Sequence, residues 1–193
     1  FFTAVAGAVP VSLVIDVRGE ITSHDVSVWE LAAQKGIFTD ITEDPVTYVN
    51  APLHAKERGL EVQLVTSPVA EDFRNVTTLR GTLADGTVRS VSGTLTGPKM
   101  VQKITEVDGF DLEVPISRHM AFFRYVDRPG VIGTLGRLLG EGSINIAAMQ
   151  VSRHDESGRA MVGLTVDSAI SAETSAAIES EISTEMLRVV NLS

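Results

Sequence analysis

The stretch YVDRPGVIGTLGRLLGEGSIN, residues 125–145, combines a carboxylate, an amide side chain and five glycines. Glycines before a helix often bind phosphate, because the first backbone amides of a helix favour an anion. The order Gly130, Gly133, Gly136 differs from the dinucleotide pattern G-x-G-x-x-G, and no Lys-Ser/Thr pair follows as in a P-loop. Asp127 would also repel a pyrophosphate at this position. The pattern therefore disfavours a nucleotide site.

A zwitterion such as an α-amino acid fits the same stretch better. The amides that open a helix at 130–132 favour a carboxylate, and Asp127 can pair with an ammonium group. Asn145 adds an amide donor and acceptor, and we expect neighbouring loop ends of the sheet to bring it close. Two simpler interpretations stay open: residues 127–130 as an ordinary turn with an N-cap, and Asn145 as a turn residue.

The elements that must position these residues follow from periodicity in the second half of the chain. Apolar, β-branched runs predict strands, and residues with helical apolar spacing predict helices between them. The predicted strands cover 119–126, 144–154, 159–167 and 185–192, and the predicted helices cover 127–142 and 171–183. The order β-α-β-β-α-β is that of the ferredoxin-like fold, with helices on one face of an antiparallel sheet.

The first half predicts a mixed α/β domain over residues 1–117, so that the whole chain is α+β with a second domain over 118–193. The apolar start is interpreted as a buried strand, with its strand run at Val11–Val17 and its end at Arg18 and Gly19. Ser23 is a candidate N-cap and Gly36 a candidate C-cap of a first helix, and Asp85-Gly86 predicts a tight hairpin. Further predicted elements are a helix near 45–59 and strands near 60–67 and 100–107.

Composition excludes several classes of function. The net charge of −9 argues against a nucleic-acid or anionic-membrane binder, and the absence of cysteine removes thiolate metal sites and a Cys nucleophile. The histidines (His24, His54, His119 and His154) have no metal-ligand spacing, so we expect no metal and no catalytic residues. The chain begins at Phe1 with a long apolar run, and we expect it to be a fragment of a longer, cytoplasmic protein.

Several stretches together resemble a known enzyme family. YVDRPGVIGTLGRLLGEGSINIAAMQVSR, ending in LRVVNLS, resembles the ACT domain of long-form D-3-phosphoglycerate dehydrogenase. PVSLVIDVRGE, VNAPLHAKERG and ADGTVRSVSGTLTGP resemble the intervening, allosteric substrate-binding domain of the same family. The resemblance implies the regulatory region of an NAD-dependent oxidoreductase of serine biosynthesis. The catalytic domains and the NAD site would lie upstream, and this fragment would hold no cofactor.

The resemblance also implies an effector site. ACT domains of this family bind L-serine, the feedback inhibitor, where the ACT domains of two subunits meet. The matching residues here are Tyr125, Asp127 and Asn145, and the helix start at Gly130 and Val131 completes the predicted site. The implied partners are therefore L-serine and further copies of the chain, which associate through both domains.

A second implied site binds phosphate or a phosphorylated substrate such as phosphohydroxypyruvate or 3-phosphoglycerate. Lys103 matches one basic residue of that site, but Glu113 and Thr165 stand where the family carries arginines. Arg118 and His119 are candidates to replace them, although Arg118 can equally be a solvated linker residue. Two alternatives to the dehydrogenase remain: the regulatory region of an L-serine dehydratase, and a stand-alone amino-acid-sensing module.

Overall fold

The structure is a computed structural model that describes residues 1–39, 41–154 and 157–192. It divides into two compact units, and the division falls within strand β5 (Val101–Val107). The first unit holds Phe1–Gln102 and Glu106–Asp108, and the second holds Lys103–Thr105 and Gly109–Ser193. Strand β6 (Phe110–Pro115) groups with the second unit. The predicted domain boundary between residues 117 and 118 stays a prediction.

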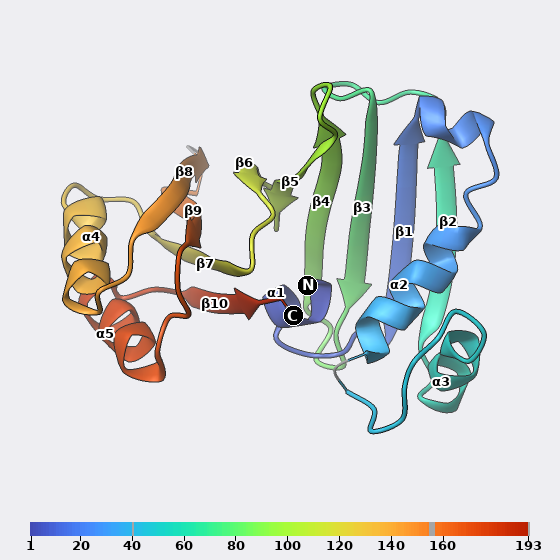
Figure 1. Cartoon of the computed structure of the whole chain (residues 1–193), viewed down its shortest axis with the longest axis horizontal. Coiled ribbons are helices and arrows are strands. Elements are labelled where there is room, and N and C mark those ends of the chain that lie inside the picture. The colour runs from blue at the N-terminus through green and yellow to red at the C-terminus, as the bar shows by residue number, and fades with distance from the viewer. Residues whose placement is uncertain (40, 155–156, 193) are drawn as a thin grey trace. The chain divides into compact units, whose positions relative to one another are not determined.

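The first unit is a mixed sheet with helices beside it (Figure 1). Its strands lie in the order β2-β1-β3-β4-β5, with β1 parallel to β2 and antiparallel to β3. The alternation in β1 points Leu13, Ile15 and Val17 into the core, where each is at most 1% exposed. The elements are α1 (Phe2–Ala6), β1 (Ser12–Gly19), η1 (Glu20–Ser23), α2 (Val28–Phe38), α3 (Ala51–Glu57), β2 (Glu61–Ser67), β3 (Asn75–Thr82) and β4 (Val88–Thr96).

Two expectations for the first unit need correction. The strand predicted over Val11–Val17 is β1, but the apolar residues before it are not strand, because Phe2–Ala6 form a short helix that Gly7 ends with φ 80°. The helix expected from Ser23 to Gly36 is α2, which begins after Ser27 and runs to Phe38. Asp25 Oδ1 accepts a hydrogen bond from the Ser27 amide (2.9 Å) and delays the start of the helix, whereas burial of Phe38 carries the helix past Gly36.

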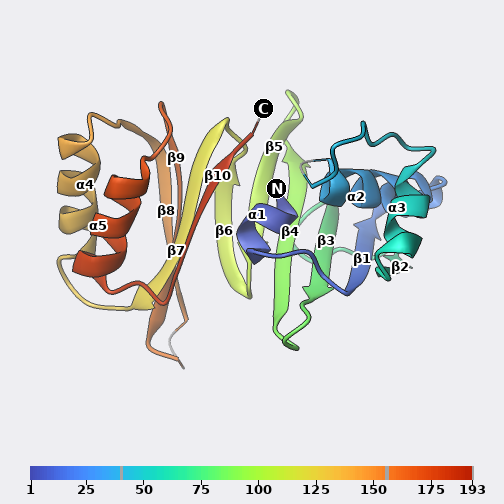
Figure 2. The same cartoon turned by 90° about the horizontal axis from the view of Figure 1, so that it is seen from below.

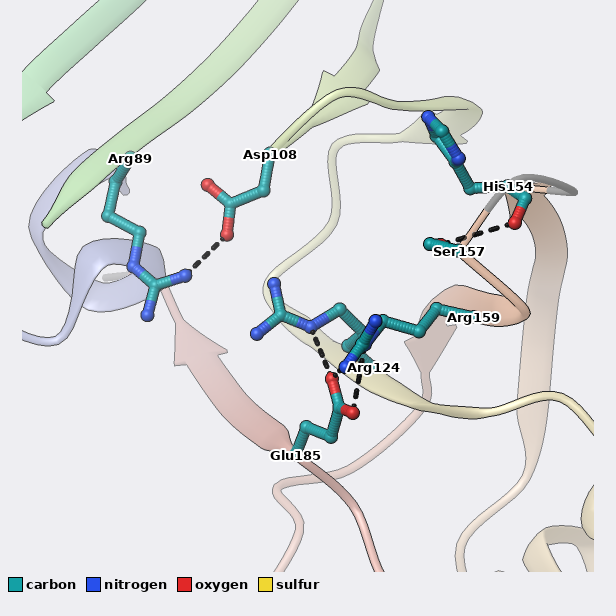
Figure 3. A network of polar contacts seen from close by, with 7 residues as sticks. All are labelled: Arg89, Asp108, Arg124, His154, Ser157, Arg159 and Glu185. Atoms are coloured by element: carbon teal, nitrogen blue, oxygen red, sulfur yellow. Dashed lines mark hydrogen bonds and ion pairs between the residues drawn. The ribbon is translucent and has the colours of Figure 1, made fainter.

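The turns of the first unit follow the sequence prediction. Gly86 has φ 83° in the hairpin between β3 and β4, and glycine adopts this conformation without strain. At the end of β5, the carboxylate of Asp108 accepts hydrogen bonds from Arg89 Nη1 (2.7 Å, Figure 3) and from the Ser90 amide (3.1 Å). These bonds join the turn to β4 and stabilise the φ of 51° at Asp108.

The predicted βαββαβ order of the second unit is confirmed. Its elements are β7 (His119–Val126), α4 (Val131–Glu141), β8 (Ile146–His154), β9 (Arg159–Val166), α5 (Ala172–Ile182) and β10 (Met186–Asn191). The sheet has the order β10-β7-β9-β8, all neighbours are antiparallel, and both helices cover one face (Figure 2). None of the described helices is long and apolar enough to cross a membrane.

The core of the second unit lies between the sheet and its two helices. Alternate residues of β7, namely Ala121, Phe123 and Tyr125, belong to a buried cluster with Leu135 of α4 and Ile178 of α5. The other sheet face contacts β6, where Leu112 and Val114 approach Gly163 of β9. The unit is therefore a sheet with a helical layer on one face and an added strand against the other.

Candidate functional site

The turn between β7 and α4 holds most of the predicted amino-acid site. Gly130 is the N-cap of α4 with φ 93°, a conformation that side-chain-bearing residues rarely adopt. No side chain among the described residues caps α4, so its first backbone amides remain available to an acceptor outside the helix. Asp127 lies four positions before Val131, and its side chain is 31% exposed. A carboxylate and free helix amides therefore lie next to one another.

The electrostatics of this turn centre on Asp127. Arg153 of β8 places Nε 2.9 Å from Asp127 Oδ2, and the Arg153 side chain is 68% exposed, so the pair is a surface ion pair of small net energy. Tyr125 is buried in the core at 2% exposure. Burial, and then the charge of Asp127, raise the pKa of Tyr125 above its usual value. The phenol therefore stays protonated and remains a donor beside the carboxylate.

A small cavity of about 150 Å³ lies at the start of α4, and Gly130 and Val131 line it with Thr134. Arg128 closes one side of the cavity by donating from Nη2 to the carbonyl oxygen of Ile182 (2.6 Å). Asp127 does not line this cavity. Gly130 and Val131 thus line the cavity and also belong to the turn that carries Asp127.

Asn145 does not meet these residues within one chain. The register pairs Ile146 with Val166 and Val166 with His119, whereas Val126 pairs with Arg159 at the other end of β9. An eight-residue strand spans roughly 25 Å, so Asn145 and Asp127 lie at opposite ends of the sheet. The expectation that neighbouring loop ends bring them together is wrong for a single copy, because α4 carries the chain back across the sheet before Asn145.

Two of the three predicted anion residues contact other side chains. Lys103 Nζ donates to Glu113 Oε2 (2.8 Å), so Glu113 neutralises the charge of Lys103. His119 Nδ1 lies 2.7 Å from Asn191 Oδ1. Arg118 is exposed, and its carbonyl oxygen accepts from the Leu192 amide. Thr165 is 3% exposed in the interior of β9. The role of Lys103, Arg118 and His119 in anion binding stays a prediction.

The second unit also contains a cationic cluster that the sequence patterns did not predict. Arg124 and Arg159 both bind the carboxylate of Glu185 beside a cavity of about 360 Å³ (Figure 3). No motif marks these residues, since they are separated widely in the chain and only the pairing of β7 with β9 and β10 joins them. Over the residues that the structure describes, no group of three or more His, Asp or Glu side chains is arranged to hold a metal ion.

Comparison with known proteins matches each half of the chain to a known domain family. Residues 6–108 match the family described as D-3-phosphoglycerate dehydrogenase intervening domain, and residues 119–182 match the ACT domain. The chain belongs to the D-3-phosphoglycerate dehydrogenase family. The ACT match covers both the turn that carries Asp127 and the two arginines of the cationic cluster.

Individual relatives agree with this assignment. The chain is 39% identical to D-3-phosphoglycerate dehydrogenase of Mycobacterium leprae over 98% of its own length and 36% of that protein. It is 39% identical to the same enzyme of Mycobacterium bovis over 95% of its length and 35% of that protein. The enzyme of Synechocystis is 36% identical over 71% of the chain and 24% of that protein. The chain thus spans about a third of the length of its mycobacterial relatives.

Proposed function

We propose that this chain is the regulatory region of a D-3-phosphoglycerate dehydrogenase and that its ACT domain binds L-serine as a feedback inhibitor. Serine carries an ammonium and a carboxylate group on adjacent atoms. The observation that supports binding is the carboxylate of Asp127 beside the uncapped amides of α4. Asp127 would accept from the ammonium group, and the amides would donate to the carboxylate.

The Arg153 pair does not oppose this role. Arg153 is mostly exposed, and replacing an exposed ion pair costs little, since such a pair contributes about 0–1 kcal/mol. The serine ammonium would take the place of Arg153 Nε, or share the carboxylate through Oδ1. Tyr125 would supply the floor of the site, because its ring is buried below the turn.

We further propose that two copies of the chain complete the serine site. Asp127 and Asn145 lie too far apart in one copy to contact one small molecule. A twofold axis brings opposite ends of two identical domains together, so that Asn145 of one copy reaches Asp127 of the other. The edge position of β8, which follows Asn145, supports such an arrangement because the outer side of this strand is unpaired in the described sheet.

Regulation would act at a distance. Serine that binds between two copies favours the assembly or domain orientation in which both halves of the site meet, and it shifts the equilibrium only by its difference in affinity between states. The β7–α4 turn does not fit NAD, since Asp127 opposes a pyrophosphate and the space beside Gly133 and Gly136 is open rather than closely packed. We therefore place the NAD site and 3-phosphoglycerate oxidation in the remainder of the parent enzyme.

Titration calorimetry of the chain with L-serine tests the proposal. Asp127→Ala should weaken serine binding roughly ten- to a hundredfold, because a hydrogen bond to a charged group contributes about 1.5–3 kcal/mol. Asp44→Ala, which removes an exposed carboxylate from a loop of the first unit, is the matched control and should leave affinity unchanged. Wild-type affinity in Asp127→Ala, or no serine binding by the unmodified chain, would refute the serine site.

The relatives described above are all dehydrogenases by name, which favours this function over the regulatory region of an L-serine dehydratase. The match of residues 6–108 to the intervening domain likewise favours it over a stand-alone sensing module. The phosphate or phosphorylated-substrate site predicted at Lys103, Arg118 and His119 remains part of the proposal. Its test is calorimetry with inorganic phosphate, in which Arg118→Ala should lower the number of phosphate ions bound per chain by one.

A further inference from the structure

The second unit also contains a cationic cluster that the proposed serine site does not use. Arg124, Arg159 and Glu185 form this cluster. Arg124 lies on β7, Arg159 begins β9, and Glu185 directly precedes β10. The register places Arg124 opposite both Met186 and Met161, so that the ends of three neighbouring strands bring the side chains together. The Glu185 amide also donates to the Arg124 carbonyl oxygen (2.8 Å), which anchors the acid at this end of the sheet.

Both arginines use the same edge of the guanidinium group. Arg124 Nε donates to Glu185 Oε2 (3.1 Å), and Arg159 Nε donates to both Oε1 (2.9 Å) and Oε2 (2.8 Å). The Nη groups of both arginines bond to no acceptor in the described part of the chain. Glu185 therefore holds both guanidinium groups through Nε, while the donors of their Nη groups remain free (Figure 3).

The charge of the cluster is not balanced. Two guanidinium groups and one carboxylate leave one net positive charge, and two guanidinium groups that share one carboxylate repel each other. A single arginine would suffice for an ion pair with Glu185. The second guanidinium group therefore raises the electrostatic free energy of the cluster unless another anion shares the site. Glu185 is well satisfied, since hydrogen bonds from Arg159 and then Arg124 lower the pKa of its carboxyl group.

The cluster opens into a cavity of about 360 Å³, which suits a small ligand. Phe110 and His154 form a further wall, with ring centroids 6.0 Å apart in an edge-to-face arrangement. Ser157 completes the lining with a hydroxyl group. The cavity thus combines cationic donors, an imidazole and one apolar surface, and all of its lining residues belong to the second unit.

We propose that the free Nη groups of Arg124 and Arg159 bind the phosphoryl group of a small phosphate-bearing anion in this cavity. A phosphoryl group offers three oxygens and up to two negative charges, which two adjacent forks can contact together. Glu185 is a positioning residue that orients both forks. The site uses none of the residues proposed for serine and none of Lys103, Arg118 or His119, so that it stands or falls independently of the proposed function.

The test uses inorganic phosphate and the whole chain in phosphate-free buffer of low ionic strength. We expect saturable binding by calorimetry, and at least tenfold weaker binding in Arg159→Ala and in Arg124→Ala. Arg137→Ala is the matched control, because Arg137 also bridges two glutamates, Glu141 and Glu181, but lies on α4 away from the cavity. Its phosphate affinity should stay within twofold of the unmodified chain.

A second measurement does not depend on the variants folding. Phosphate should shift the ¹H–¹⁵N resonances of Arg124 Nε and Arg159 Nε in the unmodified chain and leave that of Arg137 in place. Acetate at the same ionic strength separates a phosphoryl site from a general anion site, and it should bind at least tenfold more weakly. Absence of saturable phosphate binding, equal weakening by Arg137→Ala, or equal affinity for acetate would each overturn the proposal.

Discussion

Asn145 donates two hydrogen bonds to the carboxylate of Asp167, from its backbone amide to Oδ1 (3.0 Å) and from Nδ2 to Oδ2 (2.6 Å). The bonds join the start of β8 to the end of β9, so they orient the Asn145 side chain at the edge of the sheet. They leave Asn145 Oδ1 as the free acceptor of the side chain. Nδ2 also keeps a second N–H. In the proposed shared site, Asn145 could therefore accept from the serine ammonium group and donate to its carboxylate.

The Asn145–Asp167 pair predicts a pH-dependent contribution to stability. The hydrogen bonds from Asn145 lower the pKa of Asp167 below its usual value. A carboxyl group with a lowered folded-state pKa contributes stability above its unfolded-state pKa of about 4, and this contribution is lost as the pH falls through the folded-state pKa. Asp167→Asn should thus unfold at a lower temperature than the unmodified chain at pH 6, and the difference should narrow toward pH 2.

Thermal denaturation followed by circular dichroism between pH 2 and pH 6 measures this difference. Asp44→Asn provides the comparison, since no described hydrogen bond or ion pair involves its side chain. A gap between Asp167→Asn and the unmodified chain that does not change with pH would show that the ionised carboxylate is unimportant to folding.

A site shared by two copies predicts complementation between two inactive variants. Asp127→Ala and Asn145→Ala should each bind serine weakly alone. In a twofold dimer of one chain of each kind, one site carries both changes and the other carries neither. An equal mixture that exchanges chains freely should recover about a quarter of the unmodified serine sites. Calorimetric stoichiometry of the mixture measures this recovery.

The control for complementation is a mixture of Asp127→Ala with Asp127→Asn, which should recover nothing because every site lacks the aspartate. The result would also contradict the shared site if the Asp127→Ala and Asn145→Ala mixture recovers nothing although a tagged Asp127→Ala chain co-purifies untagged Asn145→Ala. Serine binding with the affinity of the unmodified chain in either variant alone would also contradict a site shared by two copies.

Gly163 is predicted to tolerate no side chain. A Cβ atom there would lie 2.8 Å from Val114 Cγ2 and 3.1 Å from Phe122 Cε1, because β6 packs against this face of the sheet. Gly163→Ala should therefore destabilise the chain by about 1–3 kcal/mol through overpacking. Gly36→Ala should have the opposite sign, with a gain of about 0.4–1 kcal/mol, since Gly36 lies inside α2 with open space around it. Urea denaturation of both variants measures these changes in the free energy of unfolding. Equal effects of the two substitutions would disprove close packing at Gly163.

Ser171 caps the N-terminus of α5, and its Oγ accepts a hydrogen bond from the Thr174 amide (3.0 Å). Ser171→Ala should lower the free energy of unfolding by about 1 kcal/mol, because the amide loses its partner. Ser171→Asp retains an acceptor and should remain close to the unmodified chain. A similar loss in both variants would indicate that the hydroxyl contributes through another contact.

The sequence by itself determined the local order of the second unit. The nearly continuous apolar run in residues 119–126 predicts the buried strand β7, and the helical apolar spacing in residues 131–139 predicts α4. The sequence also identified Asp127 beside a helix start, since the two are adjacent in the chain. Chain neighbours are predictable in this way because local geometry holds them together.

Tertiary structure decided what local patterns do not specify. The residues before β1 are mostly apolar, and they form the short helix α1, with Phe2, Val5 and Ala6 buried, rather than more strand. The distance between Asp127 and Asn145 depends on the strand order β10-β7-β9-β8, which long-range pairing sets. Arg124, Arg159 and Glu185 meet for the same reason. Their juxtaposition depends on contacts between residues far apart in sequence, and the spacing of residues along the chain carries no signal for such contacts.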